Sequence, residues 1–487
     1  MSSDSILRLG ALKDVSQFRE HVRSLHLQIP CDTEILPGSK SPLRAPIQRR
    51  ALKIGNRIAV QPMEGWDGTT DGNPTERTFR RWRRFGRSGA KLIWGGEAVA
   101  VTEDGRANPN QLQMAAHTEK GLAALREVLI DEHRLTTGSD DGLLIGLQLT
   151  HSGRFCRPHR HDRAEPRIAY HHPILDRRVG LTEESPLLSD SEIDSIIEKF
   201  CAAAASAQRL GFGFVDIKHC HGYLGHELLG AQVREGPYGG SFENRTRFLR
   251  NLVAGIRASA PGLEIGVRVS AFDTIPFRHD PSRSTPGKLG PGVPESFQEL
   301  IPYRFGFGVD SGNPVEFDLT ETFELLSLLE RLGICLVNIT GGSPYYNPHI
   351  QRPALYPPSD GYAPPEDPLI GVFRQMEVTR CLKQKFPNLI FVGSAYSYLQ
   401  EFLPNVAQAA VRMGWVDSVG LGRMVLTYPE ILLDAMEGRF LDRRRICRTF
   451  SDCTTAPRNG LPSGCYPLDS YYKESEAAVL LMKVKKR

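Results

Sequence analysis

The chain lacks several features that would assign it to a specialised class of protein. No apolar run is long enough to cross a membrane, and residues 1–5 do not begin a secretory signal. The nine cysteines are an odd number and lie scattered from Cys31 to Cys465, so we expect a reducing compartment rather than a disulfide framework. Sixty basic and 56 acidic residues leave a net charge of only +4. We therefore expect a cytoplasmic protein that binds neither nucleic acid nor a membrane.

One basic run does occur, between residues 77 and 87. Phe79, Trp82 and Phe85 recur within it at three-residue spacing, which predicts a helix with a packing stripe. On this interpretation the arginines form the solvated face of that helix and do not bind nucleic acid; they are Arg77, Arg80, Arg81, Arg83, Arg84 and Arg87.

An apolar strand followed by an amphipathic helix recurs about eight times, which predicts an α/β fold, a (β/α)8 TIM barrel. A doubly wound open sheet is the alternative, but neither G-x-G-x-x-G nor G-x-x-x-x-G-K-[ST] is present. The predicted strands are 57–62, 91–96, 143–149, 214–218, 264–269, 335–339, 389–393 and 418–421. The predicted helices are 74–87, 119–133, 189–210, 243–258, 320–332, 372–385, 398–413 and 428–435.

Three segments do not fit the repeat. Residues 1–45 form an N-terminal extension to a barrel over 46–440. Within the barrel, residues 274–313 are rich in Pro, Gly, Arg and Ser, and we expect a long loop over the top face. Residues 441–487 form a C-terminal tail that contains Cys447, Cys453 and Cys465.

The strand over 214–218 ends in a group of side chains that exchange protons. Lys218, His219, His221 and Tyr223 lie within six residues. Burying them all without partners would cost several kcal/mol, so a solvated pocket or a ligand site is favoured. His219 and His221 also form an H-x-H pair, which metal-dependent hydrolases on barrels use, and any one histidine could be structural.

Motifs at the ends of the predicted strands resemble those of the old yellow enzyme family, from about Ala45 to Phe440. They come in the family's order, and together they are far more specific than any one of them. They read N-R-I-A-V-Q-P-M over 56–63, Q-L-T-H-S-G-R over 148–154, H-G-Y-L over 221–224, Y-G-G-S-F-E-N-R over 238–245, V-R-V-S over 267–270, F-V-G-S over 391–394 and G-L-G-R over 420–423.

The resemblance implies an FMN-dependent oxidoreductase that takes hydride from NADH or NADPH, with a small molecule as substrate; assembly as a homo-oligomer stays open. Backbone donors and a guanidinium after the last two strands suit a phosphate: Gly393, Ser394, Gly422 and Arg423. The other expected flavin contacts are Gln148 at the pyrimidine edge, Arg268 near N1, and packing from Pro62, Met63 and Ala98. Arg268 could instead form a structural ion pair.

On the substrate side the resemblance implies two donors for the oxygen of an electron-poor alkene. Lys218 and His221 occupy these positions, with lysine where relatives carry histidine. Tyr223 matches the family's proton donor, which would protonate the α-carbon after hydride reaches the β-carbon.

Two departures from the family pattern bear on these expectations. Glu64 stands where some relatives carry Cys or Thr beside the flavin. Larger relatives, such as 2,4-dienoyl-CoA reductase and trimethylamine dehydrogenase, bind a 4Fe–4S cluster through four cysteines in the pattern C-x2-C-x3-C-x11-C. In this sequence only Cys453 and Cys465 keep the spacing of that pattern. We therefore do not expect that cluster or a bound metal. A metal-dependent hydrolase and a non-catalytic flavin-binding barrel remain the alternatives.

Overall fold

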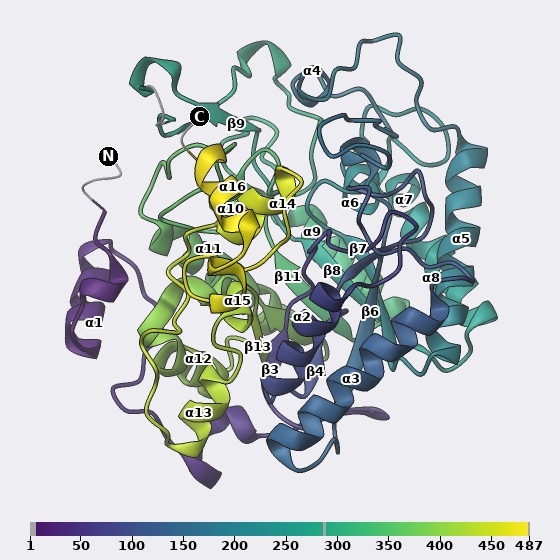
Figure 1. Ribbon diagram of the computed structural model, residues 1–487. Helices are drawn as coiled ribbons and strands as arrows, with labels where there is room; N and C mark the ends of the chain where they lie inside the picture. The colour runs from purple at the N-terminus through teal and green to yellow at the C-terminus, as the bar shows by residue number, and fades with distance from the viewer. Residues whose placement is uncertain (1–5, 286–288, 486–487) are drawn as a thin grey trace.

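A closed barrel of parallel strands forms the centre of the computed structural model, which describes residues 6–285 and 289–485 (Figure 1). Its sheet runs in the order β4-β3-β13-β12-β11-β8-β7-β6-β5, and the additional pairing of β4 with β6 closes the ring. The TIM barrel prediction is thus confirmed. The strands are β3 (Ile58–Val60), β4 (Leu92–Ile93), β5 (Ala98–Ala100), β6 (Leu144–Thr150), β7 (Phe214–His219), β8 (Glu264–Ser270), β11 (Leu336–Thr340), β12 (Ile390–Gly393) and β13 (Ser418–Leu421).

Each predicted strand coincides with one of these, but the second is interrupted. β4 ends at Ile93 and β5 begins at Ala98, and both pair with β6. Gly95 and Gly96 between them have φ of 87° and 52°, conformations that glycine adopts without steric cost. The break places β5 against the carboxyl end of β6, where Ala98 is opposite Gln148.

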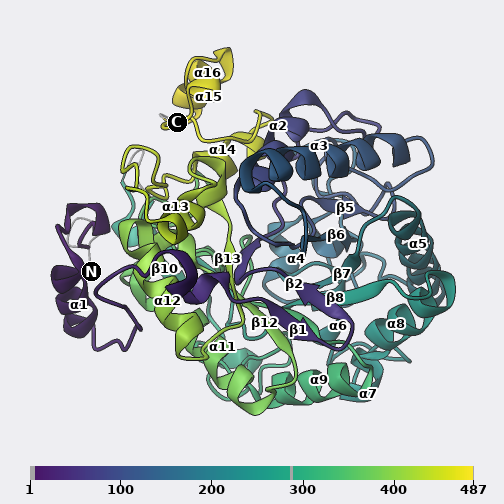
Figure 2. The same ribbon diagram turned by 90° about the horizontal axis from the view of Figure 1, so that it is seen from below.

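Helices surround the barrel as an outer ring (Figure 2). Their apolar sides pack on the strands, and α5 begins with the predicted capping box of Ser189 and Glu192. The predicted helix over 243–258 is two helices, and that over 398–413 begins with a 3-10 turn over Tyr396–Phe402. The ring consists of α2 (Glu76–Arg87), α3 (Glu119–Thr137), α5 (Asp190–Arg209), α7 (Phe242–Arg245), α8 (Arg247–Ser259), α9 (Thr320–Arg331), α11 (Pro368–Lys385), α12 (Leu403–Arg412) and α13 (Ile431–Glu437).

The segments outside the repeat add short elements to this ring. The N-terminal region contains α1 (Val15–Ser24), and the hairpin β1 (Ile47–Arg49) and β2 (Leu52–Ile54) precedes β3. The expected long loop over 274–313 contains a second hairpin, β9 (Phe277–His279) and β10 (Gly292–Pro294). Shorter helices follow strand ends: α4 (Leu175–Arg178), α6 (Leu224–Leu229) and α10 (Pro348–Gln351).

The C-terminal segment, defined here as residues 441–485, is ordered and folds back onto the barrel. It contains α14 (Asp452–Arg458), α15 (Ser470–Lys473) and α16 (Glu476–Val484), drawn in yellow near α10 in Figure 1. Asp469 accepts hydrogen bonds from Arg80 at 2.9 Å and from Arg84 at 2.8 Å. The interpretation of the α2 arginines as a solvated face is therefore wrong for Arg80 and Arg84, which the C-terminal segment binds, and for Arg81, which is only 3% exposed.

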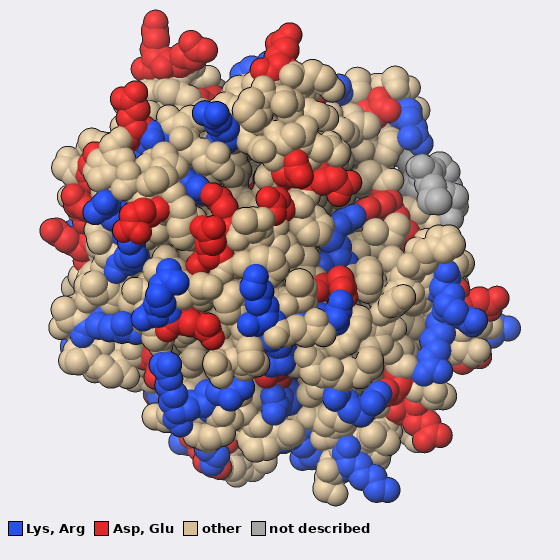
Figure 3. Space-filling model, turned by 180° about the vertical axis from the view of Figure 1, so that it is seen from behind, with Lys and Arg blue, Asp and Glu red and all other residues tan. Residues whose placement is uncertain are grey.

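Charges of both signs are distributed over the surface. On the face in Figure 3, side chains of both signs occur, with more acidic ones in the upper part of the view and more basic ones in the lower half. None of the helices among the described residues is both long and apolar enough to span a membrane.

Candidate functional site

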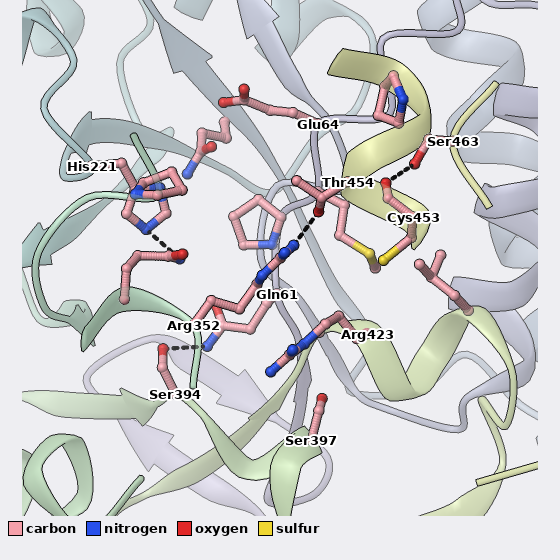
Figure 4. Close-up of a pocket in the computed structure, with 18 of the residues that line it drawn as sticks. Gln61, Glu64, His221, Arg352, Ser394, Ser397, Arg423, Cys453, Thr454 and Ser463 are labelled. Atoms are coloured by element: carbon pink, nitrogen blue, oxygen red, sulfur yellow. Dashed lines mark hydrogen bonds between the residues drawn. The ribbon is translucent and has the colours of Figure 1, made fainter. Parts of the chain in front are cut away.

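A cavity opens where the strands end, and most of the predicted site residues line it. It lies between the barrel, α10 and the first turns of the C-terminal segment (Figure 4). The predicted residues on its wall are Pro62, Met63, Gln148, Lys218, His221, Tyr223, Arg268, Ser394, Gly422 and Arg423. Gly393 and Ala98 lie behind this wall: the Gly393 carbonyl accepts a hydrogen bond from Gln61, and the Ala98 carbonyl accepts one from Gln111.

The turn after β7 aims three side chains into the cavity. His221 has φ of 66°, and its backbone N–H donates to Ser270 Oγ at 3.0 Å. This left-handed residue turns the chain so that Lys218 and Tyr223 approach each other, with the ammonium 3.6 Å from the centre of the phenol ring. His221 Nε2 lies 3.1 Å from Nε2 of Gln351 on α10. The predicted acceptor-binding and acid groups therefore share one wall.

His219 is not part of this group. Its Nδ1 lies 3.1 Å from the Ile217 carbonyl, and its ring packs near Phe248. Burial lowers its pKa to about 4, so the ring is neutral. Among the described residues, no set of three or more His, Cys, Asp or Glu side chains is placed to hold a metal ion. The H-x-H pair therefore does not converge on a common ligand position.

Glu64 contacts both Lys218 and Tyr223. One carboxylate oxygen forms an ion pair with the Lys218 ammonium, and the other accepts a hydrogen bond from the Tyr223 hydroxyl at 2.5 Å. The Tyr223 and Tyr345 hydroxyls lie 2.8 Å apart. Burial, and then the Glu64 carboxylate, raise the pKa of Tyr223 well above its ordinary value, so the phenol remains protonated. An acceptor that binds Lys218 must therefore compete with Glu64.

A buried ionic cluster holds the loop that carries Glu64. The Arg81 guanidinium, only 3% exposed, pairs with both Asp67 and Glu97. Glu97 in turn accepts a hydrogen bond from the backbone N–H of Gly65 at 3.1 Å. A Cβ on Gly65 would lie 2.0 Å from the Arg81 guanidinium, so this close approach requires glycine.

The floor of the cavity presents an amide and a guanidinium. Gln148 donates to Asp216 Oδ2 at 2.6 Å, which orients its amide, and Asp216 Oδ1 accepts from the Arg268 backbone N–H at 2.7 Å. Arg268 is buried, and its Nε has no hydrogen-bond partner among the described residues. The Arg268 side chain forms no ion pair with a described carboxylate. The alternative that Arg268 forms a structural ion pair therefore has no support.

At the far end of the cavity lies the guanidinium of Arg423, which comes just after the last strand, β13. Arg423 Nη2 donates to the Pro353 carbonyl at 2.7 Å, whereas Nη1 is buried without a partner in the described chain. Ser394 Oγ accepts a hydrogen bond from Gln61 at 3.1 Å. A Cβ on Gly422 would meet nothing within 4 Å, so the space beside its backbone is open to a ligand.

The C-terminal segment supplies part of the wall and includes the three tail cysteines. Cys453 lines the cavity together with Thr454, Pro457, Arg458 and Ser463. Burial raises the pKa values of the Cys447 and Cys465 thiols.

Sequence reasoning missed five residues that shape the cavity. Asp216 had one local signal, an acid inside an apolar strand. Gln61 stands in a family-like block but was not singled out. Arg352, Tyr345 and Thr454 reach the cavity through contacts over long sequence separations, which leave no local pattern.

Comparison with known proteins agrees with this geometry. Residues 42–281 match the model of the NADH:flavin oxidoreductase / NADH oxidase family. An NADPH dehydrogenase of Bacillus subtilis (strain 168) is 32% identical over 238 residues, which are 47% of this chain and 64% of that protein. The matched segment thus spans less than two thirds of that relative's length.

Solved structures share the fold over a longer stretch. A 2-naphthoyl-CoA reductase complex covers 89% of this chain and 58% of its own, with a TM-score of 0.62 and 18% identity. An old yellow enzyme homologue from Zymomonas mobilis covers 82% of this chain and 94% of its own, with a TM-score of 0.53 and 19% identity. Residues 42–281 of the chain thus match the NADH:flavin oxidoreductase / NADH oxidase family, which confirms the resemblance to the old yellow enzymes.

Proposed function

We propose that the chain is an FMN-dependent oxidoreductase that takes hydride from NADH or NADPH and reduces an electron-poor alkene such as an enone. One observation carries this proposal. Lys218, His221 and Tyr223 share a single cavity with two arginines, Arg268 and Arg423, that have no carboxylate partner among the described residues. The match to the family model over residues 42–281 and the similarity to NADPH dehydrogenases support it.

The cavity suits FMN. The unpartnered Nε of Arg268 and Nη1 of Arg423 are buried donors, and buried donors need an acceptor. Arg423 and the open space at Gly422 suit the phosphate, while Gln148 and Arg268 suit the polar edge of the flavin ring. When bound, FMN would supply a hydride carrier between nicotinamide and acceptor.

Two side chains would polarise the acceptor. His221 has its pKa lowered by burial and by Arg268 and Lys218, so it acts as a neutral hydrogen-bond donor. Lys218 can donate a second bond to the same oxygen when Glu64 shares or releases its ammonium. These donors stabilise the negative charge that develops on the oxygen as hydride adds to the β-carbon.

Tyr223 would supply the proton to the α-carbon. Its raised pKa keeps a proton available at neutral pH, and its ring lies beside Lys218. In this structure its hydroxyl donates to Glu64, so protonation of a substrate requires the hydroxyl to turn from Glu64 towards the acceptor. Because the sequence has no dinucleotide fingerprint, we expect nicotinamide and acceptor to use the same cavity in turn, which gives ping-pong kinetics.

The absorption spectrum and metal content of the purified protein test the proposal. We expect flavin bands that bleach on anaerobic addition of NADH or NADPH and return on addition of an enone. Bound zinc without flavin would favour the hydrolase instead. Flavin that neither reductant bleaches would indicate a binding protein without this activity.

A further inference from the structure

Two arginines, not one, stand at the end of the cavity that is assigned to phosphate. Arg352 follows α10 directly, and the Arg423 guanidinium donates to the carbonyl of Pro353, the next residue. Figure 4 draws Arg352 and Arg423 on the wall that also holds Ser394 and Ser397. The Arg423 cation is close enough to Arg352 to disfavour the charge of Arg352. Burial, and then Arg423, lower the pKa of Arg352 to about 10.

Neither guanidinium is neutralised by the protein. Within the described residues, Arg352 and Arg423 form no ion pair with a carboxylate, and Nη1 of Arg423 lacks any hydrogen-bond partner. Two other arginines of the cavity do have carboxylate partners: Arg81 pairs with Asp67 and Glu97, and Arg458 pairs with Asp360 at 2.7 Å. A buried guanidinium next to a partly buried one, both without a counterion, is costly unless an anion binds between them.

The C-terminal segment fixes the position of Arg352. Arg352 Nη1 donates to Thr454 Oγ1, the dashed contact in Figure 4. The neighbouring Thr455 accepts from the backbone N–H of Ser359 at 3.1 Å, and Arg458 donates to the Pro344 carbonyl at 2.9 Å. The first turns of α14 are therefore attached to the loop that carries Arg352.

We infer that Arg352 is a second phosphate-binding residue and that the C-terminal segment, through Thr454, completes the cofactor site. The ligand class is a dianionic phosphate monoester, whose oxygens can accept from both guanidinium groups and from Ser394. This inference rests on the proposed function, because FMN is the phosphate monoester in question. It adds a residue of the loop after β11 and a segment outside the barrel to the phosphate site.

Binding of two flavins to the apo-protein tests the inference, because riboflavin is FMN without its phosphate. Titrations monitored by flavin fluorescence should show that the parental protein binds FMN more tightly than riboflavin. Arg352→Ala should reduce that preference by about 10- to 100-fold, the usual loss for a charge-assisted hydrogen bond. Thr454→Val should reduce it by a smaller factor, because the arginine remains but loses its anchor. Arg380→Ala is the control, since Arg380 on α11 pairs with Glu377 and does not line the cavity; it should leave the preference unchanged.

The outcomes separate the inference from the proposed function. If the parental protein binds neither flavin, the proposed function fails. Where the parental protein prefers FMN, Arg352→Ala could still keep the full preference or lose affinity for both flavins equally. Either result would refute the second phosphate contact and leave the proposed function standing. Arg352→Lys provides a second variant. Because it retains a cation, it should keep part of the preference for FMN over riboflavin. A preference as low as that of Arg352→Ala would show that the positive charge at this position does not cause the preference.

Discussion

Replacing Tyr223 by Phe should separate proton donation from every other step. The ring keeps its packing beside Lys218 and Tyr345, and only the hydroxyl is lost. That hydroxyl makes contacts of 2.5 Å to Glu64 and 2.8 Å to Tyr345. Glu64 keeps its ion pair with Lys218, so we expect a stability loss of about 1.5–3 kcal/mol, the usual value for one hydrogen bond to a charged group. The folded state should survive this, because unfolding free energies are typically about 5–15 kcal/mol.

The kinetic effect should appear in one half-reaction. Reoxidation of the reduced protein by an enone should slow by about 10²–10⁴, the range for a general acid, which corresponds to about 2.7–5.4 kcal/mol in the barrier. Reduction by NADH or NADPH needs no proton from Tyr223 and should stay near the parental rate. Anaerobic stopped-flow traces at the flavin band measure both steps separately.

Tyr345→Phe is the matched control. It removes the partner of the same hydroxyl but leaves the acid in place, so enone reoxidation should slow by less than about 10-fold. Acceptors that need no assisted protonation, such as quinones, should be spared in both variants. Equal slowing of the two half-reactions in Tyr223→Phe would point to a damaged cavity, and an unchanged enone rate would refute its role as the acid.

Three further outcomes follow from the same geometry. Lys218→Ala or His221→Ala should slow enone reoxidation by about 10²–10³ while flavin binding stays intact. Stopped-flow measures the reoxidation rate, and a titration measures flavin binding. Parental reoxidation rates in both variants would show that the acceptor binds elsewhere. Arg423→Ala should weaken FMN binding by about 1.5–3 kcal/mol in an apo-protein titration, and unchanged affinity would remove the phosphate assignment. Burial lowers the pKa of His133 in the folded state to about 4, below its ordinary value of 6.5, so the folded state binds fewer protons than the unfolded state. The neutral His133 ring therefore makes its full contribution to the free energy of unfolding above pH 6.5. This contribution falls as the pH decreases towards 4, and about 2 kcal/mol of it is lost at pH 5. His133→Gln should therefore show a smaller drop in urea midpoint between pH 7 and 5 than the parental protein, and an equal drop would contradict this.

The barrel could be predicted from the sequence because its strands are buried on both faces. Such strands appear as continuous apolar runs, as in Phe214–His219, and capped amphipathic helices separate them. The strand β5 could not be predicted, because Gly95 and Gly96 signal a turn but do not indicate that a strand resumes at Ala98. The local pattern specifies the elements better than their boundaries.

Most of the candidate site could be predicted for a related reason. Lys218, His221 and Tyr223 come directly after one strand, and parallel strands end at the same edge of a barrel. The partners of these side chains could not be predicted. Arg352 and Thr454 are 102 positions apart, and Arg80 and Asp469 are 389 apart. Polar pairs over such separations have no periodicity to reveal them, and the position of Glu64 between Lys218 and Tyr223 depends on the closed barrel.

The contribution of the C-terminal segment to the cavity has a consequence for how the protein is made. Strand β13 ends at Leu421, whereas Cys453, Thr454 and Arg458 are synthesised more than thirty residues later. At roughly 5–20 residues per second, a barrel with all its strands would exist for about two seconds or more before this wall leaves the ribosome. During that interval the cavity is open on one side, and Arg352 has not yet met Thr454. We therefore expect a nascent chain to retain cofactor firmly only after this last segment has been released.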